Sequence, residues 1–209
     1  MNKIINQQKT PAMKTIKNTL ILAVLMMAGI VSNAQKQWVV DNVHSGVKFT
    51  VSHLVISEVE GNFKNFTGQM TATQPDFSDA KINFTVDVNS INTDNEMRDK
   101  HLKSDDFFNA EKFPSMSFKS LLFKKTGEKR YDLVGELTIR DVTKKVKFNV
   151  TYGGTVKDPY GNTKAGFKAT ATINRLDFGL KWNNLTEAGG AVVGSDVNIL
   201  LNLEFTQSK

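Results

Sequence analysis

The chain of 209 residues contains no cysteine and only three histidines. The missing cysteines exclude disulfides, thiolate nucleophiles and thiolate metal ligands, so the fold must depend on its core alone. The histidines, His44, His53 and His101, lack the short spacing that is typical of zinc ligands, and no HExxH motif occurs. We therefore expect neither a metal site nor a bound cofactor.

Signatures of the common enzyme classes are also missing. Asp105 and Asp106 are adjacent, so they cannot flank a substrate from two sides as a glycosidase pair does. Gly194 and Ser195 lack the G-x-S-x-G frame of a nucleophile elbow, and no phosphate-binding glycine loop occurs. We predict that the protein is not an enzyme. A hydrolase or isomerase acting on a lipid would need polar residues inside a cavity, and His53 beside an acid would be the first candidate.

No apolar run reaches the roughly 20 residues that a membrane-spanning helix requires. The run at residues 20–31 follows Lys14 and Lys17 and precedes Ser32-Asn33-Ala34, whose small residues suit a cleavage site. We interpret residues 1–34 as a signal peptide cleaved after Ala34, with a transmembrane anchor as the alternative. No cysteine follows the run, which excludes a lipoprotein anchor. The expected location is therefore periplasmic or secreted, without a stable membrane anchor.

The positive charge of the chain lies largely in that first segment. The net charge of the whole chain is +6, and residues 1–34 contain four lysines and no acid. The 23 basic and 21 acidic residues that remain give residues 35–209 a net charge of only +2. A nucleic-acid partner would need a dense basic face, so none is expected. The length of this part suits one domain.

Alternation of polar and apolar residues dominates the rest of the chain. In residues 46–53, Val47, Phe49 and Val51 share one face, which is typical of a half-buried strand. Similar patterns predict strands at residues 37–41, 58–73, 81–88, 117–125, 130–140, 144–156, 164–175 and 197–205. Gly61 and Gly68 are expected to mark a bend or bulge in the second of these.

About eight short strands, nearly all locally connected, predict an all-β fold, either a sandwich or a barrel. One polar and one apolar face per strand argue against a parallel sheet buried on both faces. The outward positions carry lysine, threonine, asparagine and aspartate, which is the reverse of an outer-membrane barrel, so the apolar faces point inward. A barrel of eight strands can either be filled by side chains or hold one small ligand.

Residues 90–120 interrupt this alternation with charged residues followed by phenylalanines. Short helices are expected near residues 95–102 and 105–109, because Ser104 and the two aspartates after it suit a helix N-terminus. The phenylalanines are expected to plug or line one end of the barrel.

Two interpretations of the basic residues in this insert stay open. Arg98, His101 and Lys103 could belong to a solvated helix face held by salt bridges. They could equally meet an anionic head group at the barrel mouth, since arginine and lysine pair naturally with phosphate oxygens. His53 is likewise either a satisfied core histidine or a contact for a ligand head group.

A series of short motifs runs through the chain in a fixed order. They are Trp38-x-x-Asp41-x-x-His44-Ser45, Val47-x-Phe49-x-Val51-x-His53-Leu54, Val59-x-Gly61-x-Phe63, Phe66-x-Gly68, Ser90-Ile91-Asn92-Thr93, Arg98-Asp99-x-His101-Leu102-Lys103-Ser104-x-x-Phe107-Phe108, Phe113-Pro114, Phe118-x-Ser120, Gly135-x-Leu137-Thr138-Ile139 and Arg175-x-Asp177-Phe178-Gly179. In this order and spacing they resemble the YceI-like family of bacterial polyisoprenoid-binding, lipocalin-like proteins. One departure is Arg140-Asp141, a turn in which the family usually has glycine.

The resemblance implies an eight-stranded antiparallel lipocalin-like barrel, with a short helical insert between two strands and a long apolar cavity. It also implies a periplasmic or secreted protein that binds an isoprenoid-type or other long-chain amphiphilic lipid. The alternative is a stress-linked interaction protein with a filled barrel core and no lipid ligand. An extended barrel could also pair as a homodimer.

The predicted site has an apolar cavity and a polar head-group region. The expected cavity residues are Phe49, Val51, Phe63, Ile82, Phe84, Val86, Phe107, Phe108, Phe118, Leu137, Phe148, Phe167, Ala169, Phe178, Ile199 and Leu201. The residues expected near the head group are His53, Arg98, His101, Lys103 and Arg175.

Overall fold

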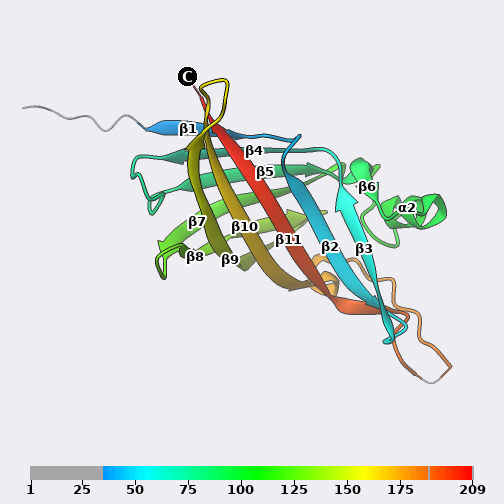
Figure 1. Cartoon of the computed structure of the whole chain (residues 1–209). Helices are drawn as coiled ribbons and strands as arrows, with labels where there is room; N and C mark the ends of the chain where they lie inside the picture. Colours follow the sequence, from blue (N-terminus) through cyan, green and yellow to red (C-terminus); the bar gives the residue numbers. More distant parts are fainter. Residues whose placement is uncertain (1–34, 188, 209) are drawn as a thin grey trace, which may run out of the picture. The chain divides into compact units, whose positions relative to one another are not determined.

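The computed structural model describes residues 35–187 and 189–208, which form a closed β-barrel (Figure 1). The predicted signal peptide, residues 1–34, lies outside the described residues. Within the described part of the chain, no helix has the length and apolar character needed to cross a membrane.

Eleven strands in this part of the chain make one antiparallel sheet. They are β1 (Lys36–Val40), β2 (Gly46–His53), β3 (Ser57–Phe63), β4 (Phe66–Ala72), β5 (Lys81–Asp87), β6 (Ile91–Asn92), β7 (Ser115–Lys125), β8 (Arg130–Ile139), β9 (Val142–Lys157), β10 (Thr163–Asn174) and β11 (Val193–Gln207). Three pairs are successive pieces of one long strand, because β1 continues into β2, β3 into β4, and β5 into β6. Eight long strands therefore follow one another around the barrel, and β1 and β2 close it by pairing with β11. The predicted eight-stranded antiparallel barrel is confirmed.

Hydrogen bonds between side chains and backbone lie at the breaks in these long strands. Asn42, between β1 and β2, donates from its side-chain amide to the carbonyl of Phe66 at 2.8 Å. Asn65, between β3 and β4, donates its backbone N–H to the hydroxyl of Ser90 at 3.0 Å. The three breaks are thereby tied to one another across neighbouring strands.

Gly61 and Gly68 lie inside β3 and β4, and the strand pairing runs through both without a register shift. Of the predicted bend or bulge at these glycines, the bulge is therefore wrong. A methyl group at Gly61 would overlap the ring of Phe49, and one at Gly68 would lie 2.6 Å from Cδ2 of Phe84. The glycines are needed because phenylalanine rings pack over the backbone at these points.

One end of the barrel, here called the closed end, is shut by the turn between β4 and β5. Phe77 in this turn is only 3% exposed. Its ring centroid lies 5.2 Å from that of Trp38 and 5.3 Å from that of Phe167. The hydroxyl of Tyr131 donates to the carbonyl of Asp76 at 2.6 Å, which fixes the turn over the interior.

The opposite end, here called the lid end, is covered by residues 93–114, which we call the lid, and by the connection from β10 to β11. α2 (Glu96–Lys103) in the lid begins at Asn95, whose side chain accepts a hydrogen bond from the backbone N–H of Arg98. The connection begins with the 3-10 helix η2 (Arg175–Phe178). The first predicted helix is thus confirmed, and Figure 1 shows it beside β6.

The second predicted helix, at residues 105–109, is wrong, because this segment is a series of turns. Ser104 caps the C-terminus of α2, where its backbone N–H donates to the carbonyl of His101. Asp105 pairs with the guanidinium of Arg140 at 2.9 Å and does not cap a helix. A partner from another element therefore overrides the local preference that the sequence predicted.

Candidate functional site

A cavity of about 190 Å³ lies inside the barrel. Every second residue of β11 from Val197 to Phe205 lines it, so it extends along the strand. Its volume exceeds that of an engineered apolar cavity of roughly 150 Å³ that stays dry and binds benzene. Among the described residues that line it, only Lys48, Ser117 and Arg175 are polar, and the first two are exposed on the outer face. The interior is therefore an apolar space and not a filled core.

Fifteen of the sixteen predicted cavity residues line this space. The exception is Phe178, which is 2% exposed and packs within η2, outside the lining. The further lining residues of apolar character are Val47, Met70, Leu102, Met116, Phe123, Leu133, Ile139, Val150, Ile173, Leu180, Val193, Val197, Leu203 and Phe205. Most of them follow from the strand alternation. Leu102 and Leu180 lie in the lid and in the β10–β11 connection, where alternation gives no signal.

Arg175 is a cation buried beside the cavity, with 4% of its surface exposed. It donates from Nε to the carbonyl of Gly194 at 2.8 Å and from Nη1 to that of Leu180 at 2.6 Å. A third bond runs from Nη2 to the carbonyl of Val193 at 3.1 Å. A guanidinium has five N–H groups, so the three bonds leave two N–H groups for another acceptor. Burial lowers the pKa of Arg175, and its hydrogen-bond partners among the described residues are neutral carbonyls.

Arg98 lies outside the cavity lining and fixes the start of the lid. Its Nε donates to the hydroxyl of Thr93 at 2.8 Å, and its Nη2 donates to the carbonyl of the same residue at 2.6 Å. Asp99 accepts from the backbone N–H of Thr93 at 2.9 Å. Lys103 and His53 are half-buried and also lie outside the lining. For Arg98, the geometry favours the structural interpretation over contact with a head group.

His101 packs on the outer side of the lid. Its Nε2 lies 2.8 Å from Oδ2 of Asp106. Its ring meets those of Phe107 and Trp182 edge-on, at centroid distances of 5.1 and 5.5 Å. His101 does not line the cavity, but it supports Phe107, which does. Of the five residues predicted near a head group, only Arg175 borders the cavity.

Arg140 holds the lid to the barrel. Its Nη1 lies within hydrogen-bonding distance of three carbonyls, at 3.2 Å from Asp105 and 3.1 Å from Phe107 and Gly179. Its guanidinium also lies 5.5 Å from the ring centroid of Phe113. The backbone of Arg140 has a φ of +56°, a conformation that favours glycine. This explains why glycine suits the turn. The arginine adds a side chain that joins the β8–β9 turn to the lid and to the β10–β11 connection.

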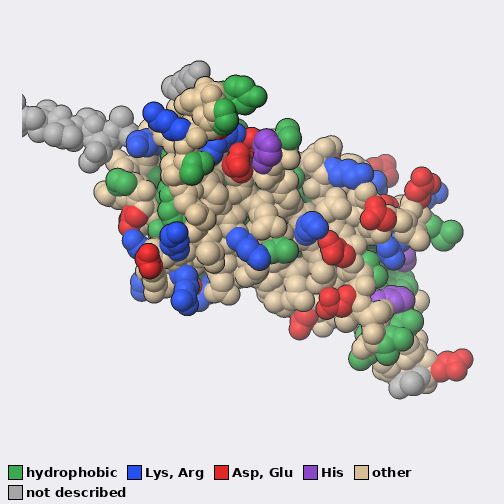
Figure 2. All heavy atoms as spheres, in the orientation of Figure 1, with side chains coloured by type: hydrophobic (Ala, Val, Ile, Leu, Met, Phe, Trp, Pro, Cys, Tyr) green, Lys and Arg blue, Asp and Glu red, His purple; other side chains and the backbone are tan. Residues whose placement is uncertain are grey.

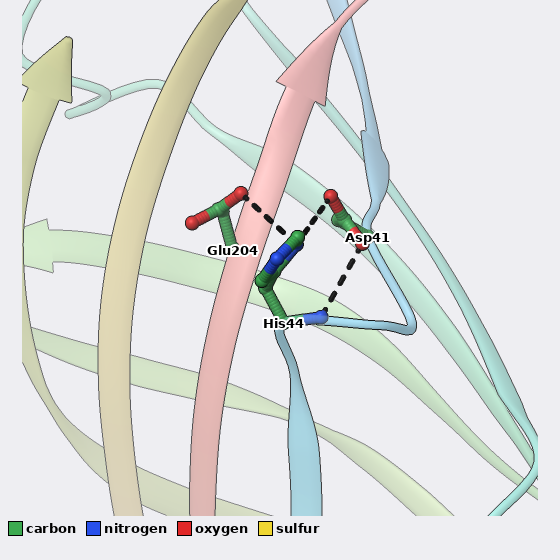
Figure 3. A group of neighbouring side chains, drawn as sticks. All are labelled: Asp41, His44 and Glu204. Atoms are coloured by element: carbon green, nitrogen blue, oxygen red, sulfur yellow. Dashed lines mark hydrogen bonds and ion pairs between the residues drawn. The ribbon is translucent and has the colours of Figure 1, made fainter. Parts of the chain in front are cut away.

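A second polar cluster lies outside the barrel, at the corner between β1 and β2 (Figure 3). Asp41, His44 and Glu204 bring a nitrogen and carboxylate oxygens within 4.8 Å of one another, a grouping that could hold a metal ion. The ammonium of Lys164, however, already lies 2.6 Å from Asp41 and 3.2 Å from Glu204. Lys164 and then His44 hold the pKa of Asp41 far below its usual range, and Asp41 raises the pKa of Lys164. The cluster therefore fixes the corner by an internal cation.

The fold and the cavity together define a lipocalin-like barrel with a lid and an apolar interior. The family model described as the YceI-like domain matches residues 38–205. The chain belongs to the YceI-like family. A UPF0312 protein of Staphylococcus aureus (strain MSSA476) is 38% identical over 170 residues, which cover 81% of this chain and 96% of the relative.

Solved structures share the same fold. The YCEI protein of Campylobacter jejuni is 32% identical, with a TM-score of 0.65 over 76% of this chain and 90% of that protein. BcnA of Burkholderia cenocepacia is 23% identical, with a TM-score of 0.69 over 79% of this chain and 98% of that protein. A polyisoprenoid binding domain from Saccharophagus degradans, described as implicated in plant cell wall breakdown, is 14% identical, with a TM-score of 0.59 over 82% of this chain and 98% of that domain.

Proposed function

We propose that the protein binds one long-chain amphiphilic lipid, isoprenoid-type or similar, inside the barrel. The observation that carries the proposal is the cavity of about 190 Å³ with its apolar lining. Burial of a hydrocarbon chain there would contribute about 0.8 kcal/mol per CH₂ group. The shared fold with a polyisoprenoid binding domain supports the same class of ligand. A filled barrel that acts only as an interaction protein is the alternative, and the cavity counts against it.

The shape of the cavity favours a slender ligand. The lining residues of β11 from Val197 to Phe205 span about 27 Å of strand, or about 20 Å along the axis at a tilt of roughly 40°. A volume of about 190 Å³ leaves no room for two hydrocarbon chains side by side over that length. We therefore expect a single-chain lipid and not a two-chain phospholipid.

Arg175 is the natural contact for the polar head of such a ligand. It is the one buried polar side chain in the described lining, and two of its N–H groups have no assigned acceptor. A phosphate or carboxylate would accept these N–H groups and supply the missing negative charge. The head would then lie at the lid end, with the tail directed toward the closed end.

The entrance belongs at the lid end, beside β3. β6 pairs with β3 only at Asn62 and Phe63, so in the described structure the edge of Ser57–Gly61 has no strand along it. The lid lies next to this gap, because a methyl group at Gly61 would lie 2.8 Å from Cγ2 of Thr93, and the ring centroid of Phe108 lies 5.9 Å from that of Phe63. Displacement of the lid would open a path into the cavity without breaking the barrel.

The protein is proposed to act as a carrier in the periplasm or outside the cell. The signal-peptide pattern of residues 1–34 supports this location. A carrier and not an enzyme is proposed because the described lining offers one buried polar residue, Arg175, and no acid or nucleophile beside it.

Native mass spectrometry of the protein purified from its own host tests the proposal. We expect a mass increment of one amphiphile, which solvent extraction should release for identification. Titration with a polyprenyl phosphate and the matching polyprenyl alcohol then tests the head-group contact, and the phosphate should bind more tightly. The binding proposal would be abandoned if no amphiphile co-purified and neither compound raised the melting temperature.

A matched pair of variants tests where the ligand lies. Ala169 lines the cavity and is 4% exposed, whereas the next residue, Thr170, is exposed on the outer face. Ala169→Phe should fill the bore and lower affinity about tenfold or more, which corresponds to ~1.4 kcal/mol. Thr170→Phe should leave affinity unchanged, and circular dichroism should confirm that both variants fold. Equal affinities for the two variants would place the ligand elsewhere.

A further inference from the structure

Four large apolar side chains protrude from the lid end beyond the barrel wall. Leu54, Val55 and Ile56 form the turn between β2 and β3 and are 38%, 72% and 85% exposed. Leu185, in the β10–β11 connection, is 63% exposed. The two segments are joined, because Leu54 donates its N–H to the carbonyl of Val192 at 2.9 Å. We call these four residues the apolar tip, and Figure 2 shows hydrophobic side chains gathered at this end of the molecule.

The backbone of the tip is unfavourable for the residues that occupy it. Leu54 and Val55 have φ angles of +53° and +65°, and the N–H of Ile56 bonds to the carbonyl of His53 at 3.2 Å. Such a turn favours Asn-Gly, and a β-branched residue at positive φ is a clear outlier. Backbone strain of this kind is characteristic of functional segments. The chain thus keeps exposed apolar side chains at a cost to local stability.

The tip continues the wall of the cavity. Val51 on β2 and Val193 on β11 both line the cavity. Val51 is three residues from Leu54, and Val193 follows Val192, to which Leu54 is bonded. The same two strands therefore lead from the apolar interior to the apolar tip, next to the gap along β3.

The size and charge of the tip indicate what would cover it. A stable protein interface takes about 20–30 residues on each side, whereas the tip offers four protruding side chains. Insertion into a lipid surface needs no such area, because each apolar side chain gains by its own burial. The tip segments, residues 53–58 and 184–187, contain Glu58 and Glu187 but no lysine or arginine. The surface that fits is therefore a zwitterionic one, since anionic lipids would repel these carboxylates.

We propose that the apolar tip inserts into the surface of a zwitterionic lipid bilayer and sets the lid end against it. The inference rests on the proposed function, because docking would let a lipid pass between bilayer and cavity without crossing water.

Single-cysteine labelling gives a direct test, because the chain contains no cysteine of its own. Val55→Cys and Tyr160→Cys are each labelled with an environment-sensitive fluorophore. Tyr160 is 89% exposed in the β9–β10 turn at the closed end and is the matched control. With phosphatidylcholine vesicles, the label at position 55 should brighten and shift to the blue, and the label at position 160 should not change. No change at position 55 would overturn the proposal.

A second variant removes the tip without harming the turn. The double variant Leu54→Asn and Val55→Gly installs the favoured residues, so its melting temperature should equal or exceed that of the parent chain. Its partitioning onto phosphatidylcholine vesicles should fall about tenfold or more, because two inserted side chains are lost. Replacing part of the phosphatidylcholine by phosphatidylglycerol should not raise binding. Unchanged partitioning of the variant, or binding that requires the anionic lipid, would contradict the proposal.

Further measurements separate the docking inference from the proposed function and from dimer formation. Binding of a fluorescent single-chain amphiphile should be the same in the parent chain and the double variant, since neither residue lines the cavity. If the parent chain bound the amphiphile but not the vesicles, the docking inference alone would be refuted. If the parent chain bound neither the amphiphile nor the vesicles, the proposed function would be refuted as well. If sedimentation showed a dimer that the double variant abolishes, the tip would be an interface between two copies and the proposal would be wrong.

Discussion

At the scale of single residues, Lys164 determines how the corner between β1 and β2 responds to acid. It lies between Asp41 and Glu204, and it holds the pKa of Asp41 far below the usual range of an aspartate. Asp41 also accepts a hydrogen bond from the N–H of Val43, so its charge fixes the backbone of the turn. The D-x-x-H-S motif that the sequence displays therefore forms a corner that an ion pair holds in place.

The Asp41→Asn variant should lose stability at neutral pH and show a weaker dependence on acid. The pKa of Asp41 is lowered in the folded state, so its contribution is complete above the unfolded value of about 3.9 and is lost progressively as pH falls from there toward the lower pKa of the folded state. Urea unfolding from pH 7 down to about pH 2 should show a constant difference between the two chains above about pH 4 and a shrinking difference below it. Lys164→Gln should have a similar effect. A parallel pH dependence in all three chains would contradict this account.

Residue roles were predictable where they follow from alternation and not where they depend on a partner. Phe49, Phe84 and Ile199 were placed correctly in the wall because their faces follow from the strand period. Nothing in the sequence indicates that Arg98 would donate to Thr93. Nothing in it indicates that the N–H groups of Arg175 would bind carbonyls of the β10–β11 connection and of β11.

At the scale of elements, the strand period predicted the barrel walls and missed the contacts that shape its ends. β2 begins and ends at Gly46 and His53, as predicted. Residues 58–73 were predicted as one strand, and the structure breaks it between β3 and β4 while keeping both pieces in line. Residues 105–109 were predicted as a helix, because a distant arginine cannot be anticipated from a local capping pattern.

The Arg140→Gly variant should loosen the lid while relaxing the turn. Glycine removes the strain at a φ of +56°, but the variant loses the side-chain bonds to Asp105, Phe107 and Gly179. Hydrogen exchange should become faster in residues 105–108 and stay unchanged in β8 and β9. Arg140→Asn, which tolerates the same backbone, is the matched control for strain and should show the same loosening. Unchanged exchange in the lid would show that the guanidinium does not hold it.

At the scale of the whole molecule, the barrel contains a cavity, which lowers the stability of the fold. The chain has no cysteine, so no disulfide compensates for that loss. A cavity removes packing contacts that a filled core would have, so the empty protein is less stable than its size allows. The sequence predicted the barrel, its inward apolar faces and its single domain from alternation and resemblance. It could not predict the volume, because the space left between side chains depends on their packing in three dimensions.

The loaded protein should therefore melt well above the empty one. A ligand at 100 times its dissociation constant stabilises the folded state by about 2.7 kcal/mol, which raises the melting temperature of a domain of this size by about 5–10 °C. Calorimetry of the protein before and after solvent extraction, and again after reloading, measures the difference. Ala169→Phe should show little response to added ligand. Identical melting of extracted and reloaded protein would mean that the cavity is not the binding site.

The glycines beneath the phenylalanine rings have a consequence for selectivity. Gly61, Gly68 and Gly135 each lie where a methyl group would strike a ring, and those rings, Phe49, Phe84 and Phe118, all face the cavity. Each ring stays close to the wall only because the glycine beneath it has no side chain. The width of the cavity is therefore determined partly on the wall side of the rings. If the proposed lipid binds there, one added methyl group in the wall should exclude a methyl-branched chain before a straight one, without altering any atom that the lipid would touch.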